Sequence, residues 1–251
     1  MRPVAESPWA SDNGRVTFVQ QVLSLWDDDE PEAPSAPPAR PAHEARVLAD
    51  STDRVAWLRA RSRGITATDV ARLSSPRAVQ AVVLDKLYGN GFGGNAYTDH
   101  GRAREPEIAR WVQRHHAIAP SSRLFHAEGS DRHLATPDGV GLLDDGTVVL
   151  AEIKTTKKAW SSIPRSYLRQ VAWQQYVLGA ERTLVVWERH VDFVPVDAEP
   201  ECRWVERDDS EIHRLVTLAD AVLDALAAAP PVDPWGHEPT PYEPPPYDPL
   251  R

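Results

Sequence analysis

A chain of 251 residues has room for one domain of ordinary size with tails, or for two small domains. Its single cysteine, Cys202, excludes a disulfide framework and any cysteine-based zinc or iron–sulfur site, and we expect this side chain to be a small core residue. The sequence contains no signal-peptide pattern and no apolar run long enough to cross a membrane, so we expect a soluble, intracellular protein without a membrane partner.

The formal net charge of −9 would argue against a nucleic-acid partner if it were spread evenly along the chain. It is not, because residues 54–182 hold 19 Lys/Arg against 12 Asp/Glu, a surplus of +7. Residues 183–227 hold 4 Lys/Arg against 11 Asp/Glu, a balance of −7. Electrostatic recognition depends on local patches more than on totals, so the charge does not exclude DNA.

Proline marks both ends of the chain, since 7 of its 23 prolines lie in the first 50 residues and 9 in the last 24. We interpret residues 27–45 and 230–251 as disordered or extended, because proline-rich polar sequence sustains neither a helix nor a β-ladder. Apolar residues at near-helical spacing over 16–26 fit a docking helix, or equally a segment that folds back on its own domain. The predicted organisation is an N-terminal segment (1–50), one folded domain (51–227) and a C-terminal tail (228–251).

Helices and strands alternate between these ends. We predict helices over 53–62, 68–75, 101–118, 166–180 and 210–229, and strands over 133–143, 148–156, 182–190, 192–197 and 202–208. Thr68 or Asp69 is placed to cap the second helix, and Gly179 ends the fourth. The order predicts an α/β (α+β) fold in which helices flank a central mixed β-sheet.

The stretch TPDGVGLLDDGTVVLAEIKTT (136–156) predicts a β-hairpin whose arms carry Asp138, Glu152 and Lys154. The two-residue period of a strand places Glu152 and Lys154 on one face, and Asp138 begins the partner arm, so the two carboxylates can meet. Neighbouring carboxylates hold a proton or a divalent cation, and oxygen-only ligands favour Mg²⁺ or Mn²⁺. Such an ion can hold a phosphodiester oxygen, with Lys154 stabilising charge on phosphorus. The alternative is a plain surface ion pair at a strand end.

Five stretches that carry these residues follow one another with ordinary spacing: GITATDVARL (64–73), GRAREPEIARWV (101–112), ATPDGVG (135–141), LAEIKTT (150–156) and YLRQVAWQQYVLGA (167–180). Together they resemble the PD-(D/E)xK nucleases, specifically the YqaJ-like viral recombinase group that includes the phage lambda exonuclease. The resemblance covers roughly residues 54–190 and implies a restriction-endonuclease-like core.

The resemblance also implies roles for individual residues. It makes Glu105, Asp138, Glu152 and the backbone carbonyl of Ile153 metal ligands, Lys154 the catalytic lysine, and Gln170 a residue that organises the site. Glu107 is an alternative to Glu105, although the G-x-x-x-E-P order favours Glu105. Gln174, one turn after Gln170, is a weaker candidate and fits an ordinary polar neighbour.

A pocket for the 5′-phosphate of DNA is implied at Arg61, Thr68 and Thr136. A guanidinium with hydroxyl donors is suited to a phosphate group. The alternatives are that Thr68 is only a helix cap, that Arg61 is only a surface arginine, and that Arg63 supplies the guanidinium.

The function implied is that of a 5′→3′ exonuclease that degrades one strand of double-stranded DNA from its ends and exposes 3′ single strands for recombination. Two Mg²⁺ ions, replaceable by Mn²⁺, are the implied cofactors, and the location is the cytoplasm of a bacterial or phage-infected cell. A trimer and a single-strand annealing partner are further implications. A structure- or site-specific DNA endonuclease of the same fold and a non-catalytic DNA-end binding module are the alternatives.

Overall fold

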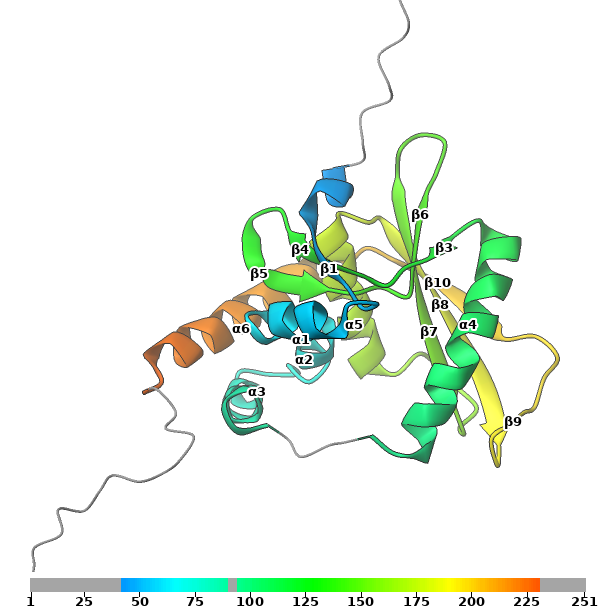
Figure 1. Cartoon of the computed structure of the whole chain (residues 1–251), viewed down its shortest axis with the longest axis horizontal. Helices are drawn as coiled ribbons and strands as arrows, with labels where there is room; N and C mark the ends of the chain where they lie inside the picture. Colours follow the sequence, from blue (N-terminus) through cyan, green and yellow to red (C-terminus); the bar gives the residue numbers. More distant parts are fainter. Residues whose placement is uncertain (1–41, 90–93, 231–251) are drawn as a thin grey trace, which may run out of the picture. The chain divides into compact units, whose positions relative to one another are not determined.

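The computed structural model describes residues 42–89 and 94–230 (Figure 1). The predicted helix over 16–26 and the tail after residue 230 lie outside the described residues. Residues 42–45, interpreted as disordered or extended, instead belong to a 3₁₀-helix, η1 (Ala42–Arg46). That interpretation was wrong because His43 is buried against Phe125, and because Arg46 donates hydrogen bonds to the carbonyls of Val177 (2.7 Å) and His126 (3.1 Å).

The strands form two sheets. A four-stranded sheet has the order β1 (Val47–Asp50), β4 (Arg123–Ala127), β5 (Ser130–Ala135), β2 (Ile65–Thr66). A six-stranded sheet has the order β10 (Glu201–Glu206), β8 (Arg182–Val191), β7 (Val148–Thr156), β6 (Gly139–Leu142), β3 (Ala119–Pro120), with β9 (Val194–Pro195) paired to β8. In the six-stranded sheet β7 and β8 are parallel and the other pairs antiparallel, which confirms the predicted mixed sheet. The four-stranded sheet was not predicted.

Six α-helices complete the described part of the chain: α1 (Arg54–Ser62), α2 (Ala67–Val70), α3 (Arg77–Tyr88), α4 (Ala96–His116), α5 (Arg165–Leu178) and α6 (Asp209–Ala228). Five of them correspond to predicted helices, whereas α3 was not predicted. None of the described helices is both long and apolar enough to span a membrane.

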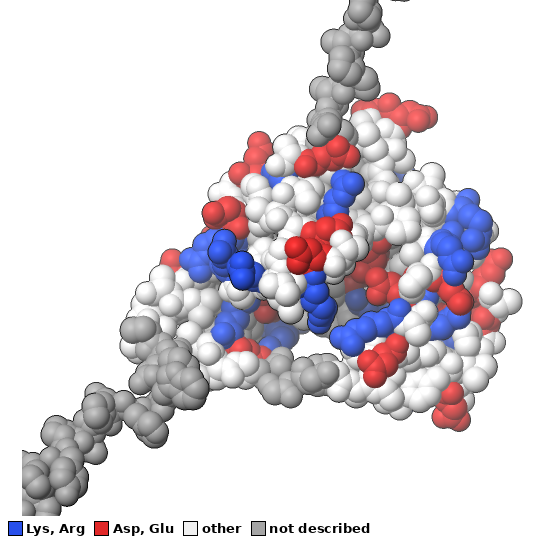
Figure 2. All heavy atoms as spheres, viewed as in Figure 1, with Lys and Arg blue, Asp and Glu red and all other residues white. Residues whose placement is uncertain are grey.

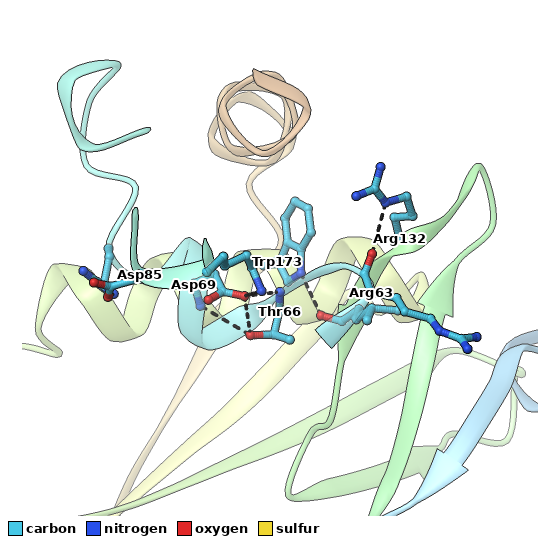
Figure 3. A network of polar contacts seen from close by, with 9 residues as sticks. Arg63, Thr66, Asp69, Asp85, Arg132 and Trp173 are labelled. Atoms are coloured by element: carbon cyan, nitrogen blue, oxygen red, sulfur yellow. Dashed lines mark hydrogen bonds and ion pairs between the residues drawn. The ribbon is translucent and has the colours of Figure 1, made fainter. Parts of the chain in front are cut away.

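The start of α2 differs from the prediction. Thr66, not Thr68 or Asp69, is the N-cap, because its backbone is extended and its hydroxyl accepts a hydrogen bond from the Asp69 amide (Figure 3). Asp69 completes the cap from three residues later, since its carboxylate accepts from the Thr66 amide at 2.8 Å. Thr68 therefore lies inside the helix with an exposed side chain.

The predicted strand over 133–143 is divided between the two sheets. β5 ends at Ala135 in the four-stranded sheet, and β6 begins at Gly139 in the six-stranded sheet. Pro137 lies between them and cannot donate to a β-ladder, so the chain leaves one sheet and enters the other at this point. Asp138 is thereby placed at the fork between the sheets.

Helices cover both faces of the six-stranded sheet. Ile108 and Val112 of α4 pack with Ala151 and Ile153 of β7, and the ribbon of α4 runs along this sheet in Figure 1. On the other face Val171 of α5 belongs to a separate cluster with strand residues of β8. Because residues alternate along β7, Glu152 and Lys154 are directed to the α5 face.

Cys202 is exposed, so the expectation of a core cysteine was wrong. The residue lies on β10, which is an edge strand of the six-stranded sheet. An edge strand has a neighbour on only one side, and in the described structure the exposed residues of β10 include Glu201, Cys202 and Arg203.

The parallel pairing of β2 with β5 predicts a strict requirement for glycine at residue 64. A Cβ at this position would lie 2.2 Å from the carbonyl oxygen of Arg132, next to the Ile65–His133 pair. We expect Gly64→Ala to lower the free energy of unfolding by about 1–3 kcal/mol, as overpacking does. Gly129→Ala is the control, since a Cβ there has no atom within 4 Å. Urea unfolding curves that are the same for both variants would contradict this close approach.

Candidate active site

Asp138 is fixed at the point where β6 leaves β7. The last backbone pair of these strands joins Gly139 to Ala151, so the amide of Ile153 lies beyond the ladder. The Asp138 carboxylate accepts a hydrogen bond from that amide, with Oδ2 2.7 Å from the nitrogen. This bond holds Asp138 beside β7, next to Glu152.

Glu152 lies inside the protein, and its side chain is only 1% exposed. Its Oε1 accepts from Nε2 of Gln170 at 2.5 Å and is also bound by the Lys154 ammonium, and its Oε2 accepts from Nε2 of Gln174 at 2.7 Å. Burying a carboxylate is costly unless donors surround it, and these three side chains supply them. The structure therefore brings Glu152, Lys154 and Gln170 together, while their roles in catalysis stay predictions.

Gln174 donates a hydrogen bond to Glu152 that is as direct as the one from Gln170. The interpretation of Gln174 as an ordinary polar neighbour was therefore too weak. Gln174 is fully buried, and its Oε1 has no hydrogen-bond partner among the described residues. A buried amide with an unpaired carbonyl carries a cost, which the bond to Glu152 helps to offset. The signal in the sequence was the four-residue spacing from Gln170, which puts both amides on one helix face.

The acidic groups of the site influence one another electrostatically. Burial raises the pKa of Asp138 well above its usual value, and the charges of Glu152 and Glu105 add to this, while Lys154 and the Ile153 amide oppose it. Burial alone would lower the pKa of Lys154, but Glu152 and Asp138 outweigh burial, so the pKa of Lys154 is raised. Lys154 is therefore an ammonium ion over the ordinary working range of pH.

Glu105 lies on α4, and its side chain is exposed at the edge of this cluster. Partial burial by its neighbours raises its pKa, Lys154 lowers it and Glu152 raises it, so its carboxylate lies within the field of the site. No described residue forms a hydrogen bond or ion pair with Glu105, whereas Glu107 is engaged by Arg104. The geometry thus favours Glu105 over Glu107 as the helical carboxylate.

The donor set fits a hard divalent cation in chemistry. Asp138, Glu152, Glu105 and the Ile153 carbonyl offer only oxygen atoms, which are the ligands that Mg²⁺ prefers. Within the described residues, no three His, Cys, Asp or Glu side chains lie close enough together to form a ready-made metal site. The role of these residues as ligands remains a prediction.

The residues predicted to bind a 5′-phosphate are placed on neighbouring segments. Thr68 follows β2 and Thr136 follows β5, and these two strands are paired. Thr136 has a buried hydroxyl without a hydrogen-bond partner in the described structure, and Thr68 is exposed. Arg61 lies over Trp57, 4.3 Å from the ring centroid, whereas Arg63 is exposed. No described hydrogen bond joins Arg61, Thr68 and Thr136, so the pocket also remains a prediction.

Positive and negative groups share the face that carries α1 and α4. Figure 2 shows Lys and Arg side chains around a hollow between these helices, with Asp and Glu atoms visible inside it. A concave acidic centre with a basic surround is suited to a phosphate backbone that meets cations.

Comparison with solved structures supports the fold. The chain is similar to LHK-Exo, an alkaline exonuclease from Laribacter hongkongensis, with 25% sequence identity and a TM-score of 0.53 over 68% of this chain and 92% of that chain. A complex of LHK-Exo with dAMP gives 23% identity and a TM-score of 0.54 over the same shares. A phage-related exonuclease from Haemophilus somnus gives 13% identity and a TM-score of 0.50, over 65% of this chain and 95% of that chain.

No curated protein matches the chain by sequence. The model of the YqaJ-like viral recombinase domain matches residues 56–181, which is slightly more than half of the 251 residues. The matched region holds most of α1 and all of α4, β6, β7 and α5, and it includes every residue of the candidate site. On this match and on the fold, the chain belongs to the YqaJ-like viral recombinase family.

Proposed function

We propose that this protein is an Mg²⁺-dependent exonuclease that degrades one strand of double-stranded DNA in the 5′→3′ direction. The observation that carries the proposal is the convergence of Asp138, Glu152 and Lys154 at the sheet fork, with Glu105 in their field. The family and the similarity to LHK-Exo, which is an alkaline exonuclease, support a nuclease that acts on DNA ends.

Three carboxylates would hold the metal. Asp138 is fixed by the Ile153 amide and Glu152 by two glutamines, so both are presented with little freedom, and Glu105 adds a third from α4. When bound, Mg²⁺ supplies Lewis-acid chemistry, since it lowers the pKa of water and offsets negative charge on the phosphate. Preorganised ligands avoid the cost of reordering the site during the reaction.

Lys154 acts as a cation in this proposal. Because its pKa is raised, the ammonium group donates hydrogen bonds and does not serve as a general base. Its place beside Glu152 lets it orient the attacking water or stabilise the negative charge that grows on the phosphate oxygens. The same position explains why a strand end carries a lysine that is mostly shielded from solvent.

Strand polarity rests on the end pocket. Arg61, Thr68 and Thr136 would bind a 5′-phosphate and set which strand enters the site. The 3′ single strand left behind would be the substrate for recombination, and a single-strand annealing protein is the partner expected for it. A ring-shaped trimer is the oligomer we propose by family resemblance.

The first test compares linear duplex DNA, with 5′-phosphate or 5′-hydroxyl ends, and covalently closed circles. With Mg²⁺ we expect loss of the linear duplex, faster with the phosphate, and no cutting of circles; EDTA should stop the reaction. Asp138→Asn and Glu152→Gln should lower the rate by at least about 10³-fold, because each removes a charge from the catalytic unit. Gel and acid-soluble release assays measure both quantities.

Each result bears on the proposal. Cutting of circles would favour an endonuclease of the same fold, and full activity in either variant would overturn the assignment of the site. Asp144→Asn, an exposed change in the hairpin turn, is the matched control and should retain the rate.

The second prediction concerns the glutamine that holds Glu152. Gln174→Leu removes a donor from a buried carboxylate, so we expect activity to fall by about 10-fold or more, as loss of a ligand-orienting partner does. Gln80→Leu, exposed on α3, is the control for adding an apolar side chain. Steady-state rates at several Mg²⁺ concentrations test this, and equal rates for the two variants would show that Gln174 only fills space.

The third prediction concerns pH and stability without divalent metal. Since folding raises the pKa of Asp138, the group stabilises the fold below its ordinary pKa and loses this contribution as pH rises through the folded pKa. Asp138→Asn removes the charge but keeps an acceptor for the Ile153 amide. In EDTA the variant should melt higher than the wild type at neutral pH, and the gap should close in acid.

Thermal unfolding across pH, with Asp144→Asn as the control, measures this gap. A variant that melts lower than the wild type at neutral pH would show that the Asp138 carboxylate is not strained by its surroundings.

A further inference from the structure

The part of α4 that carries Glu105 is weakly held by apolar packing. The buried residues of the helix are Ile108, Ala109 and Val112, which all follow Glu105. Pro106, next to Glu105, lacks an amide hydrogen and so removes one backbone hydrogen bond from this part of the helix. Some other contact must fix the turn that presents Glu105.

Arg104 supplies that contact. Its guanidinium forms a two-pronged ion pair with Glu188 of β8, with Nε 2.8 Å from Oε1 and a terminal nitrogen 2.7 Å from Oε2. The Glu188 side chain is only 8% exposed, so this pair is shielded from water. Two parallel hydrogen bonds between a guanidinium and a carboxylate fix the orientation of the two groups and also strengthen the ion pair. Arg104 also pairs with Glu107, but that side chain is 53% exposed, and exposed pairs contribute little.

A second contact lies one turn earlier on the same helix. Gly101 approaches β7 so closely that a Cβ there would be 3.3 Å from the hydroxyl of Thr155. Thr155 is the direct neighbour of Glu188 in the parallel β7–β8 register. Gly101 and Arg104 therefore meet the sheet at the same level, just past Lys154.

The Arg104–Glu188 pair affects the site because it fixes the rotation of α4 about its own axis. Successive residues of an α-helix are separated by about 100°, so fixing Arg104 toward β8 directs Glu105 to another side. That side faces β7, because Glu105 lies on one helix stripe between Gly101, which approaches β7, and Ile108, which packs against it.

Rings of Tyr97 and His100 contact His190 and Phe193 earlier in α4, and the Arg104–Glu188 pair adds the hydrogen bonds that the described structure shows between the next turn and the sheet. The rotation of the turn that carries Glu105 therefore depends on this pair.

We propose that Glu188, acting through Arg104, is a positioning residue that holds Glu105 toward the candidate metal site. The inference rests on the proposed function in so far as Glu105 is taken as a metal ligand. Neither Arg104 nor Glu188 touches the reacting atoms in this proposal. Each acts only through the orientation of the first turns of α4.

The test uses Glu188→Gln and, as the matched control, Glu107→Gln. Both remove a carboxylate that pairs with Arg104, but only Glu188 is buried. We expect Glu188→Gln to weaken Mn²⁺ binding to the protein without DNA by about 10-fold, the usual effect of losing a group that orients a ligand. Titration calorimetry with Mn²⁺ measures this, and Glu107→Gln should bind as the wild type does.

Two further readouts separate positioning from general destabilisation. Hydrogen exchange should speed up in residues 96–107 of α4 and not in α5 or β7. The Mg²⁺ concentration for half-maximal nuclease activity should rise, while the rate at saturating Mg²⁺ stays close to that of the wild type. A loss of rate that saturating Mg²⁺ does not restore would contradict the proposal.

Arg104→Lys provides a second variant if Glu188→Gln folds poorly. It keeps the charge but loses the two-pronged geometry, so its effect on Mn²⁺ binding should be smaller and in the same direction. The double variant should be no weaker than the Glu188→Gln single variant, because both act through one pair. Additive effects, or normal Mn²⁺ binding by both single variants, would overturn the proposal.

Failure of the inference can be told from failure of the proposed function. A wild-type protein that binds Mn²⁺ but degrades no DNA would refute the nuclease proposal, while a weaker Glu188→Gln variant would still support the positioning role. An active wild type with an unaffected Glu188→Gln variant would refute the positioning role alone.

Discussion

Burial of the Glu152 carboxylate is the constraint on which the rest of the site depends. A carboxylate that is 1% exposed requires donors on both oxygens, and strand β7 alone offers only Lys154 from the same face. The other donors come from α5, which must therefore lie against this face with Gln170 and Gln174 directed at the strand. Packing of Val171, between these two amides, holds the helix there.

The separation of the two sheets is the second requirement. If β5 and β6 were one continuous strand, its backbone would continue to pair along β7. A backbone carbonyl of that strand would then accept the hydrogen bond of the Ile153 amide. Because Pro137 interrupts the strand, that amide is left for the Asp138 carboxylate, 2.7 Å away. At the fork, the Ile153 amide of β7 therefore holds the side chain of Asp138 in place. Gly139, where a Cβ would lie 3.1 Å from that of Ala151, allows β6 to begin at once.

Sequence patterns predicted the parts of this arrangement that depend on local periodicity. Alternation along 148–156 placed Glu152 and Lys154 on one face, and helical spacing identified α4, α5 and α6. The four-stranded sheet escaped prediction because β2 has only two residues, too few to show a period. Arg104 and Glu188 are 84 residues apart, so their ion pair depends on the fold and leaves no local signal. Thr66 was missed as a cap because Thr68 and Asp69, both good capping residues, follow it so closely.

Electrostatics gives the site its chemical character. Three carboxylates, Asp138, Glu152 and Glu105, influence one another's pKa values here against the single ammonium of Lys154, although in the described structure they are not close enough together to form a ready-made metal site. Arg104 of α4 is already paired with Glu188 and Glu107. Burial and the neighbouring carboxylates raise the pKa of Asp138, so this group holds a proton more readily than an exposed carboxyl does. In the proposed function, divalent cations held by these three carboxylates would offset their negative charge as the site meets a phosphodiester.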